Sequence, residues 1–156
     1  MKTDVTDLRG PVAPMPFELL AEREAIAQLA RLYCLGIDTR NEAMVLSLFD
    51  PDAPVKGMLG AARAADYLPK LVAGRDLFAV TTHSIANQYV VVEGDRARTW
   101  SYCVCRHVYR EADRAPYVTA VIYKDELKRT PEGWIIVART ADHQWREGEG
   151  PGQAGR

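Results

Sequence analysis

The sequence predicts a single α+β domain in which a strongly bent, antiparallel sheet wraps around a long N-terminal helix. The length of 156 residues suits one domain with one core. Helical periodicity is confined to the first half of the chain, and the second half is rich in β-branched and aromatic residues interrupted by short turns. Helices followed by strands on so short a chain indicate an α+β arrangement.

The composition excludes several classes of protein. Apolar residues make up 47% and charged residues 26% of the chain, as in ordinary globular domains. The formal net charge of −1 offers no basic footprint for nucleic acid or an anionic membrane. No apolar run is long enough for a membrane helix, and the N-terminus lacks the apolar core of a signal peptide. We therefore expect a cytoplasmic protein that binds neither nucleic acid nor membranes.

The two ends of the chain are expected to be flexible. Residues 1–16 contain three prolines and a glycine and are predicted to form an arm, and residues 147–156, EGEGPGQAGR, a loose tail. The folded domain is therefore predicted to span residues 17–146.

Three helices are predicted in the first half of that domain. From residue 17 to about residue 37, apolar residues recur with helical spacing and indicate a long amphipathic helix. A short helix fits NEAMVLSLF, with Asn41 as its N-cap. The segment DPDAPVKGMLG then has room for one short strand. A third helix over residues 61–74 ends at Gly74, and Pro69 leaves its second half open.

Four β segments follow and are joined by turns of hairpin length, which predicts an antiparallel meander. They cover residues 78–92, 96–110, 117–129 and 134–145.

The second of these segments has two unlike faces, because strand side chains alternate. Its small face consists of Ala97, Thr99, Ser101, Cys103, Cys105 and His107, and its bulky face of Arg98, Trp100, Tyr102, Val104, Arg106 and Val108. Small residues on a concave sheet either leave room for a pocket or pack beneath a helix, and both alternatives remain open. The bulky face, with aromatic residues among arginines, predicts a subunit interface.

The three cysteines form no disulfide framework, because their number is odd and no CxxC occurs. The alternation Cys103-x-Cys105-x-His107 places three potential metal ligands on one strand face. Same-face neighbours lie about 6.6–7 Å apart, which is too far for a compact tetrahedral site. We therefore expect buried thiols and no metal. Neither a GxGxxG nor a GxxxxGK[ST] nucleotide loop is present.

The polar residues that could line such a pocket are Tyr33, Asp38, His83 and His107. The face of His83 continues through mostly apolar residues, so the ring is expected to point inward. A lone histidine in that position is more often a core residue than a catalyst. A carboxylate within reach would orient the ring and stabilise the imidazolium formed on proton abstraction, and Asp38 is the nearest candidate.

Tyr33 and Asp38 present a geometric difficulty. Residues five apart on a straight helix are rotated by roughly 140° from each other, so the two side chains cannot share one face. Gly36 is a poor helix-interior residue. A break at Gly36 is therefore predicted, which would let Asp38 turn back toward the ring that Tyr33 faces.

Three motifs resemble the SnoaL-like branch of the nuclear-transport-factor-2-like superfamily over residues 17–146. They are a helix ending Y-x4-D, the strand TTH…NQ-x-V-V-V-E-G-D, and the hairpin Y-x-D-E-L-K-R-T-x-x-G-W-x-I. The resemblance implies a cone-shaped α+β barrel. The members most similar in pocket chemistry are scytalone dehydratase, bile acid 7α-dehydratase and hexachlorocyclohexane dehydrochlorinase. These enzymes use a His–Asp pair without a cofactor to eliminate a leaving group, and they are typically trimers.

The resemblance also implies roles for individual residues. By position, Asp38 and His83 match the acid–base pair, Tyr33 matches the phenol that assists the leaving group, and His107 resembles a second pocket histidine. The bile acid enzyme has an aspartate where this chain has Cys105 or His107, which argues against a bile-acid-like substrate.

Four further residues are predicted to bind substrate: Cys103, Cys105, Asn87 and Arg139. Asn87 either binds a backbone group or faces the pocket. Arg139 approximates a late-strand arginine of the dehydrochlorinase, but a spacing difference of about one residue would reverse its face, so a structural or interfacial role is also open. His143 is expected to be peripheral.

The leading hypothesis is a cofactor-free lyase, foremost a dehydratase, acting on a small hydrophobic, cyclic or aromatic molecule. His83 would abstract a proton, Asp38 would orient its ring, and Tyr33, with His107, would assist the departing oxygen. Isomerisation, cyclisation and retro-aldol cleavage remain alternatives. So does a non-catalytic ligand-binding module or one like the small subunit of ring-hydroxylating dioxygenases. The expected assembly is a homo-oligomer, a trimer ahead of a dimer.

Overall fold

The computed structural model describes residues 4–151 and confirms the α+β class. The helices are α1 (Phe17–Asp38), α2 (Glu42–Ser47) and α3 (Ala64–Ala73), with short 3-10 turns η1 (Val5–Asp7) and η2 (Gly74–Leu77). The strands are β1 (Pro54–Gly57), β2 (Gly60–Arg63), β3 (Phe78–Glu93), β4 (Arg96–Tyr109), β5 (Tyr117–Thr130) and β6 (Gly133–Glu147).

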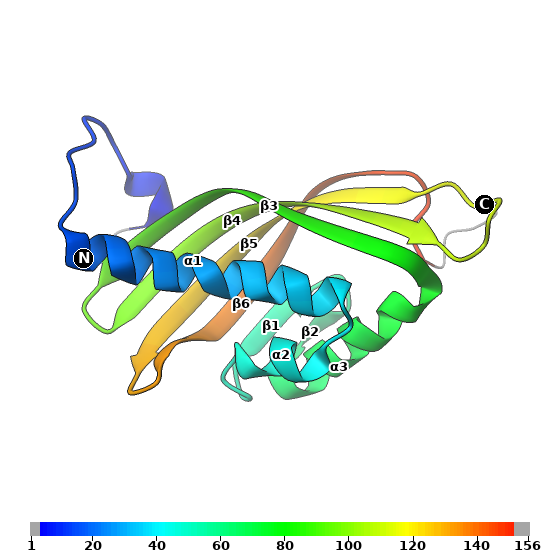
Figure 1. Cartoon of the computed structure of the whole chain (residues 1–156), viewed down its shortest axis with the longest axis horizontal. Helices are drawn as coiled ribbons and strands as arrows, with labels where there is room; N and C mark the ends of the chain where they lie inside the picture. The colour runs from blue at the N-terminus through cyan, green and yellow to red at the C-terminus, as the bar shows by residue number, and fades with distance from the viewer. Residues whose placement is uncertain (1–3, 152–156) are drawn as a thin grey trace.

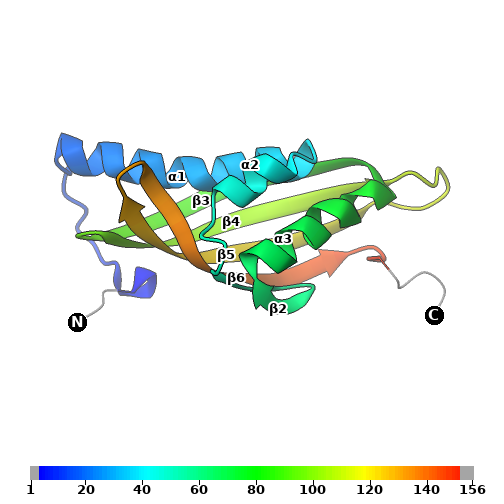
Figure 2. The ribbon, with the colours of Figure 1, turned by 90° about the horizontal axis from the view of Figure 1, so that it is seen from below.

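The six strands form one curved sheet in the order β2-β1-β6-β5-β4-β3. All neighbours are antiparallel except β1 and β6. The sheet is not closed into a barrel, because β2 and β3 are edge strands. Figure 1 shows α1 lying along the long strands, and Figure 2 shows α3 crossing the space between α1 and the β1–β2 hairpin. Helices and sheet together therefore form a cone around a large buried core, with a second small cluster of Phe78, Tyr109 and Tyr117.

The local helix signals are largely confirmed. The side chain of Asn41 accepts a hydrogen bond from the backbone of Met44 at 3.0 Å and so caps α2. Helix α3 continues through Pro69 and ends before Gly74. Gly74 has an ordinary φ of −61°, so the chain tightens into η2 instead of reversing. The segment after α2 forms two short strands where the sequence had room for one.

The predicted break at Gly36 is wrong, because α1 runs through it to Asp38. Gly36 is buried, and a Cβ at this position would lie 2.7 Å from Cγ2 of Val45 in α2. The glycine therefore permits α2 to approach α1 closely. Its role is in packing, not in bending the helix.

Strand β3 contains a bulge that reverses its faces. Ile85 pairs with Cys103 and Gln88 with Ser101, so three steps along β3 match two along β4. One extra residue in a strand moves all later side chains to the opposite face. The alternation assumed from His83 through Asn87 therefore fails, and Asn87 is exposed.

The small face of β4 is buried along its whole length, as its alternation predicts. Both alternatives for this face apply, at different positions. Ala97, Cys103 and Cys105 belong to the hydrophobic core that includes α1, and Cys105 and His107 also line a cavity. On the opposite face Tyr102 and other bulky residues are exposed, and their use in a homo-oligomer remains a prediction.

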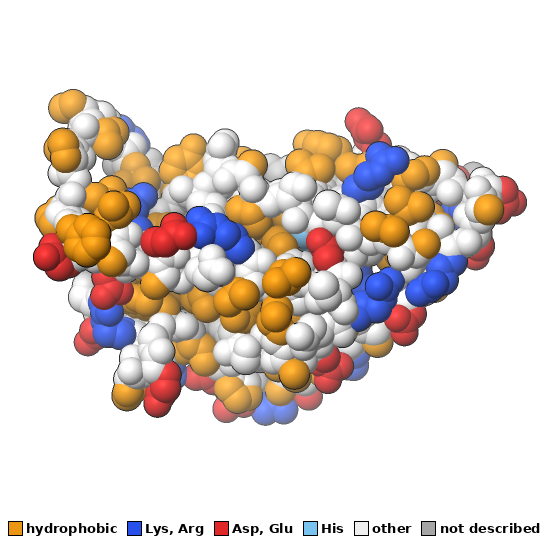
Figure 3. All heavy atoms as spheres, viewed as in Figure 1, with side chains coloured by type: hydrophobic (Ala, Val, Ile, Leu, Met, Phe, Trp, Pro, Cys, Tyr) orange, Lys and Arg blue, Asp and Glu red, His pale blue; other side chains and the backbone are white. Residues whose placement is uncertain are grey.

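Parts of the two terminal segments make defined contacts. Asp4 caps η1, and Val5 is buried. Near the other end, the hydroxyl of Tyr109 donates to the carbonyl of Glu149 at 2.7 Å. Residues 1–3 of the predicted arm and residues 152–156 of the predicted tail lie outside the described residues. Figure 3 shows hydrophobic side chains exposed along α1 and the N-terminal segment. Within residues 4–151, none of the helices has both the length and the apolar character needed to span a bilayer.

Replacement of Gly36 by alanine should lower the free energy of unfolding. Overpacking against Val45 costs about 1–3 kcal/mol, and the better helix propensity of alanine offsets only about 0.5–1 kcal/mol of it. Gly74→Ala is the matched control, because nothing lies within 4 Å of its added Cβ. Urea unfolding of both variants measures the difference. Equal stability of the two would show that α2 does not depend on the close approach at Gly36.

Candidate active site

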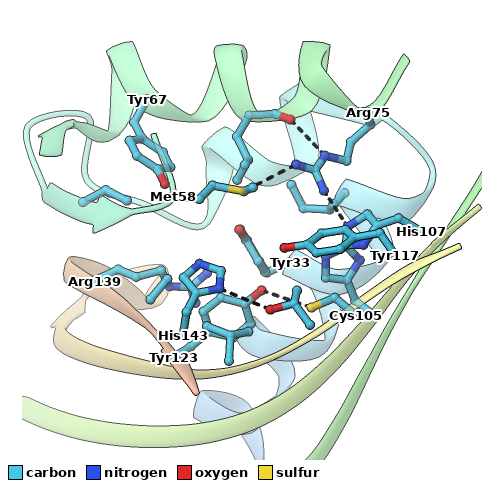
Figure 4. Close-up of a pocket in the computed structure, with 17 residues that line it drawn as sticks. Tyr33, Met58, Tyr67, Arg75, Cys105, His107, Tyr117, Tyr123, Arg139 and His143 are labelled. Atoms are coloured by element: carbon cyan, nitrogen blue, oxygen red, sulfur yellow. Dashed lines mark hydrogen bonds between the residues drawn. The ribbon is translucent and has the colours of Figure 1, made fainter. Parts of the chain in front are cut away.

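A cavity lies between α1, the α3–η2 segment and the sheet. It encloses about 540 Å³ of space between the atoms, its open mouth included. Figure 4 shows that side chains from all of these elements converge on it. They are Tyr33, Ile37, Val55, Met58, Tyr67, Leu71, Arg75, His83, Cys105, His107, Tyr117, Thr119, Val121, Tyr123, Arg139, Ala141 and His143.

His83 and Asp38 form a hydrogen-bonded pair at the wall of this cavity. Nδ1 of His83 lies 2.6 Å from Oδ1 of Asp38, and the backbone N–H of His83 donates to Oδ2 at 2.8 Å. The hydroxyl of Thr81 donates to Oδ1 at 2.9 Å. Asp38 does not line the cavity, so it approaches the ring from behind. Asp38 therefore reaches His83 from an unbroken α1, and the predicted turn of Asp38 toward the ring that Tyr33 faces is not needed.

The pKa values of both His83 and Asp38 are shifted from their ordinary values. Burial opposes a charge on the ring, but hydrogen bonds to Asp38 and Cys105 raise the pKa of His83 to about 10. Burial also opposes the charge of Asp38, yet its bonds to His83 and Thr81 hold the pKa of that carboxyl below its ordinary value. An ionised Asp38 and a strongly basic His83 follow from this arrangement.

His107 is the second histidine of the cavity, and its surroundings lower its pKa where those of His83 raise it. Burial and the nearby charges of Arg75 and His83 lower the pKa of His107 to about 4, so its ring is neutral near pH 7. Nη1 of Arg75 donates to Nε2 of His107 at 2.8 Å. The ring proton therefore resides on Nδ1. The two histidine ring centroids lie only 5.7 Å apart.

Tyr33 and Arg139 line another side of the cavity. The hydroxyl of Tyr33 points into the open space (Figure 4), and burial raises its pKa to about 12, so it is a proton-bearing donor. Arg139 is buried and makes a bidentate ion pair with Asp125, with both N–O distances at 2.7 Å. Its guanidinium lies 4.1 Å from the centre of the Tyr33 ring. Arg139 is thus both a structural ion-pair partner and a pocket-lining residue.

The predicted residues are only partly brought together. Cys105 lines the cavity, but Cys103 lies beneath it with its sulfur 3.6 Å from that of Cys105. Asn87 is excluded by the bulge in β3. His143, expected to be peripheral, is exposed but lines the cavity.

Sequence reasoning missed several lining residues, among them Arg75, Met58 and Tyr67. Tyr117 and Tyr123 could have been found, because they share one face of β5 by simple alternation. Arg75 carries no such signal, since it lies in a four-residue 3-10 turn. Among residues 4–151, no three or more His, Cys, Asp and Glu side chains are grouped so as to hold a metal ion.

Comparison with known proteins identifies the family of this chain. A sequence profile of the SnoaL-like domain family matches residues 18–140. An uncharacterized protein of Mycobacterium tuberculosis is 29% identical over 125 residues, which cover 77% of this chain and 84% of the relative.

Solved structures share this fold at low sequence identity. A candidate scytalone dehydratase from Novosphingobium aromaticivorans matches with a TM-score of 0.77 and 21% identity, over 85% of this chain and 90% of that one. A hexachlorocyclohexane dehydrochlorinase from Novosphingobium barchaimii matches with a TM-score of 0.74 and 20% identity, over 86% and 94% of the two chains.

An NMR titration of the three histidines should separate the two cavity rings. His83 should titrate far above the ordinary value of 6.5 and His107 below it. In Asp38→Asn the carboxylate charge is gone, so the pKa of His83 should fall while His107 changes less. Signals are assigned from single His→Asn variants. An unshifted His83 in the wild-type protein would contradict the charged pair.

Proposed function

We propose that this chain, which belongs to the SnoaL-like domain family, is a cofactor-independent lyase that dehydrates a small cyclic or aromatic molecule. The observation that carries the proposal is the His83–Asp38 pair, whose ring stands at the wall of a buried cavity while its carboxylate partner stands outside. The dehydratase and dehydrochlorinase named among the similar structures support elimination chemistry.

In the proposed mechanism His83 removes a proton from the substrate carbon. Asp38 holds Nδ1, so Nε2 is the nitrogen that exchanges the proton. The carboxylate stabilises the imidazolium that forms on proton abstraction, which makes the transfer easier. A carbonyl or phenol next to the reacting carbon would make its proton acidic enough for this base.

The departing hydroxyl needs a proton or a hydrogen bond, and Tyr33 is the proposed donor. Its phenol points into the cavity and keeps its proton because of burial. His107 was also expected to help. Its Nε2 accepts from Arg75, so only the proton on Nδ1 is available for donation. We therefore assign the main role at the leaving group to Tyr33.

The high pKa of His83 sets the expected pH dependence. The ring acts as a base only in its neutral form, which is the minority form below its pKa. kcat/KM should therefore rise with pH toward about 10, the pKa of His83. A rate that falls over the same range would instead assign His83 as the proton donor.

Two variants test the acid–base pair after a substrate has been found by screening hydroxylated cyclic and aromatic compounds for loss of water by mass spectrometry. His83→Asn and Asp38→Asn should each lower kcat/KM by about 10²–10⁴-fold, the usual contribution of a positioned acid–base group. In Asp38→Asn the rising limb of the pH profile should also move to lower pH, because the carboxylate no longer raises the pKa.

Glu42→Gln is the matched control, since Glu42 is an exposed acid in the first turn of α2. It should retain wild-type activity. Circular dichroism and size-exclusion chromatography check that all variants keep their fold and assembly. Full activity in both pair variants would refute the proposed mechanism.

A further inference from the structure

Arg75 is a buried cation in the cavity that the proposed acid–base chemistry does not use. Only 6% of its surface is exposed. Nε donates to the carbonyl of Leu71 at 3.3 Å and Nη1 to His107 at 2.8 Å. Nη2 contacts the sulfur of Met58 at 3.8 Å, and the guanidinium carbon lies 5.6 Å from the centre of the Phe78 ring. Figure 4 shows the guanidinium pointing from η2 toward Met58 and His107.

No carboxylate within residues 4–151 lies within 4 Å of this guanidinium. The adjacent Asp76 is largely exposed and pairs with Arg40 at 3.4 Å. Asp38 is engaged by His83. Every hydrogen-bond acceptor around Arg75 is therefore neutral, and a thioether is a weak acceptor.

Arg139 provides the contrast inside the same cavity. It is equally buried, but both oxygens of Asp125 neutralise it. An arginine is always protonated in proteins. Burying its charge without a counterion is costly. Arg75 thus has the desolvation cost of a buried ion without the compensating partner that Arg139 has.

We propose that Arg75 is the binding site for a carboxylate group of the substrate. This inference rests on the proposed function and narrows it to small cyclic or aromatic organic acids. The carboxylate would accept charge-assisted hydrogen bonds from the guanidinium, which are stronger and shorter than neutral ones. His107 holds Nη1 in place, and the bound carboxylate would replace the thioether of Met58 at Nη2.

The position of Met58 supports this exchange. It lies in the turn between β1 and β2, and 45% of its surface is exposed. Its unbranched side chain can move without disturbing the core. A carboxylate held by Arg75 would lie in the same cavity as His83 and Tyr33, with the His107 ring between Arg75 and His83. Arg75 would thereby orient the substrate for proton abstraction.

The test compares matched acids and amides as probes and requires no turnover. Dissociation constants are measured by NMR titration for benzoate and benzamide, and for cyclohexanecarboxylate and its primary amide. The wild-type protein should bind the acid of at least one pair about tenfold more tightly, a difference of ~1.4 kcal/mol. Arg75→Gln should abolish that preference while amide binding stays within about twofold.

Three further variants make the result specific. Arg75→Met removes the charge with an unbranched apolar side chain and replaces Arg75→Gln if that variant does not fold. Arg63→Gln removes an exposed arginine outside the cavity and should keep the preference. His83→Asn should also keep it, because the carboxylate is bound by Arg75 and not by the imidazolium.

Three results would overturn the proposal. They are equal binding of acid and amide in every wild-type pair, a preference that persists without Arg75, and a preference that disappears only in His83→Asn. None of these measurements depends on catalysis. The carboxylate site can therefore fail while the His83–Asp38 mechanism holds, and the reverse is equally detectable.

Discussion

The geometry of the site depends on the hydrogen bonds between the Asp38 carboxylate and strand β3. Asp38 is the last residue of α1, and its carboxylate accepts the backbone N–H and ring Nδ1 of His83 and the hydroxyl of Thr81. Because β3 is an edge strand, its outward N–H would otherwise be unpaired. One carboxylate thus joins the helix to the sheet edge and sets the direction of the His83 ring.

The charges of the cavity divide into those neutralised by the protein and one that is not. Asp38 faces the basic His83, and Asp125 holds Arg139 in a bidentate pair. Among residues 4–151, the hydrogen-bond partners of the Arg75 guanidinium are neutral. His83 and Arg139 each have a carboxylate partner, whereas Arg75 has none among the described residues. An anionic substrate would supply the missing counterion, which is an electrostatic reason to expect one. The proposed elimination mechanism and the proposed carboxylate site therefore use different residues of one cavity.

The sequence predicts elements well and their local irregularities poorly. The alternating strand β4 is recognisable because its periodicity extends over the whole segment. The predicted break at Gly36 is wrong because helix propensity describes an isolated helix. The role of this glycine is to allow close contact with Val45 of another helix. The bulge beside Asn87 leaves the apolar composition unchanged, so nothing local reveals the reversal of faces. Arg75 is placed in the cavity only by tertiary packing.

The two cavity histidines show how neighbours, and not residue type, assign chemical roles. A carboxylate behind His83 raises its pKa, and a guanidinium against His107 lowers the pKa of that ring. Pairs of groups whose environments push their pKa values apart mark acid–base assignments. Arg75 occupies Nε2 of His107, whereas Asp38 binds Nδ1 of His83 and leaves Nε2 of that ring toward Cys105 and the cavity. Arg75 therefore has two effects: it keeps His107 neutral, and it leaves His83 as the ring best placed to exchange a proton.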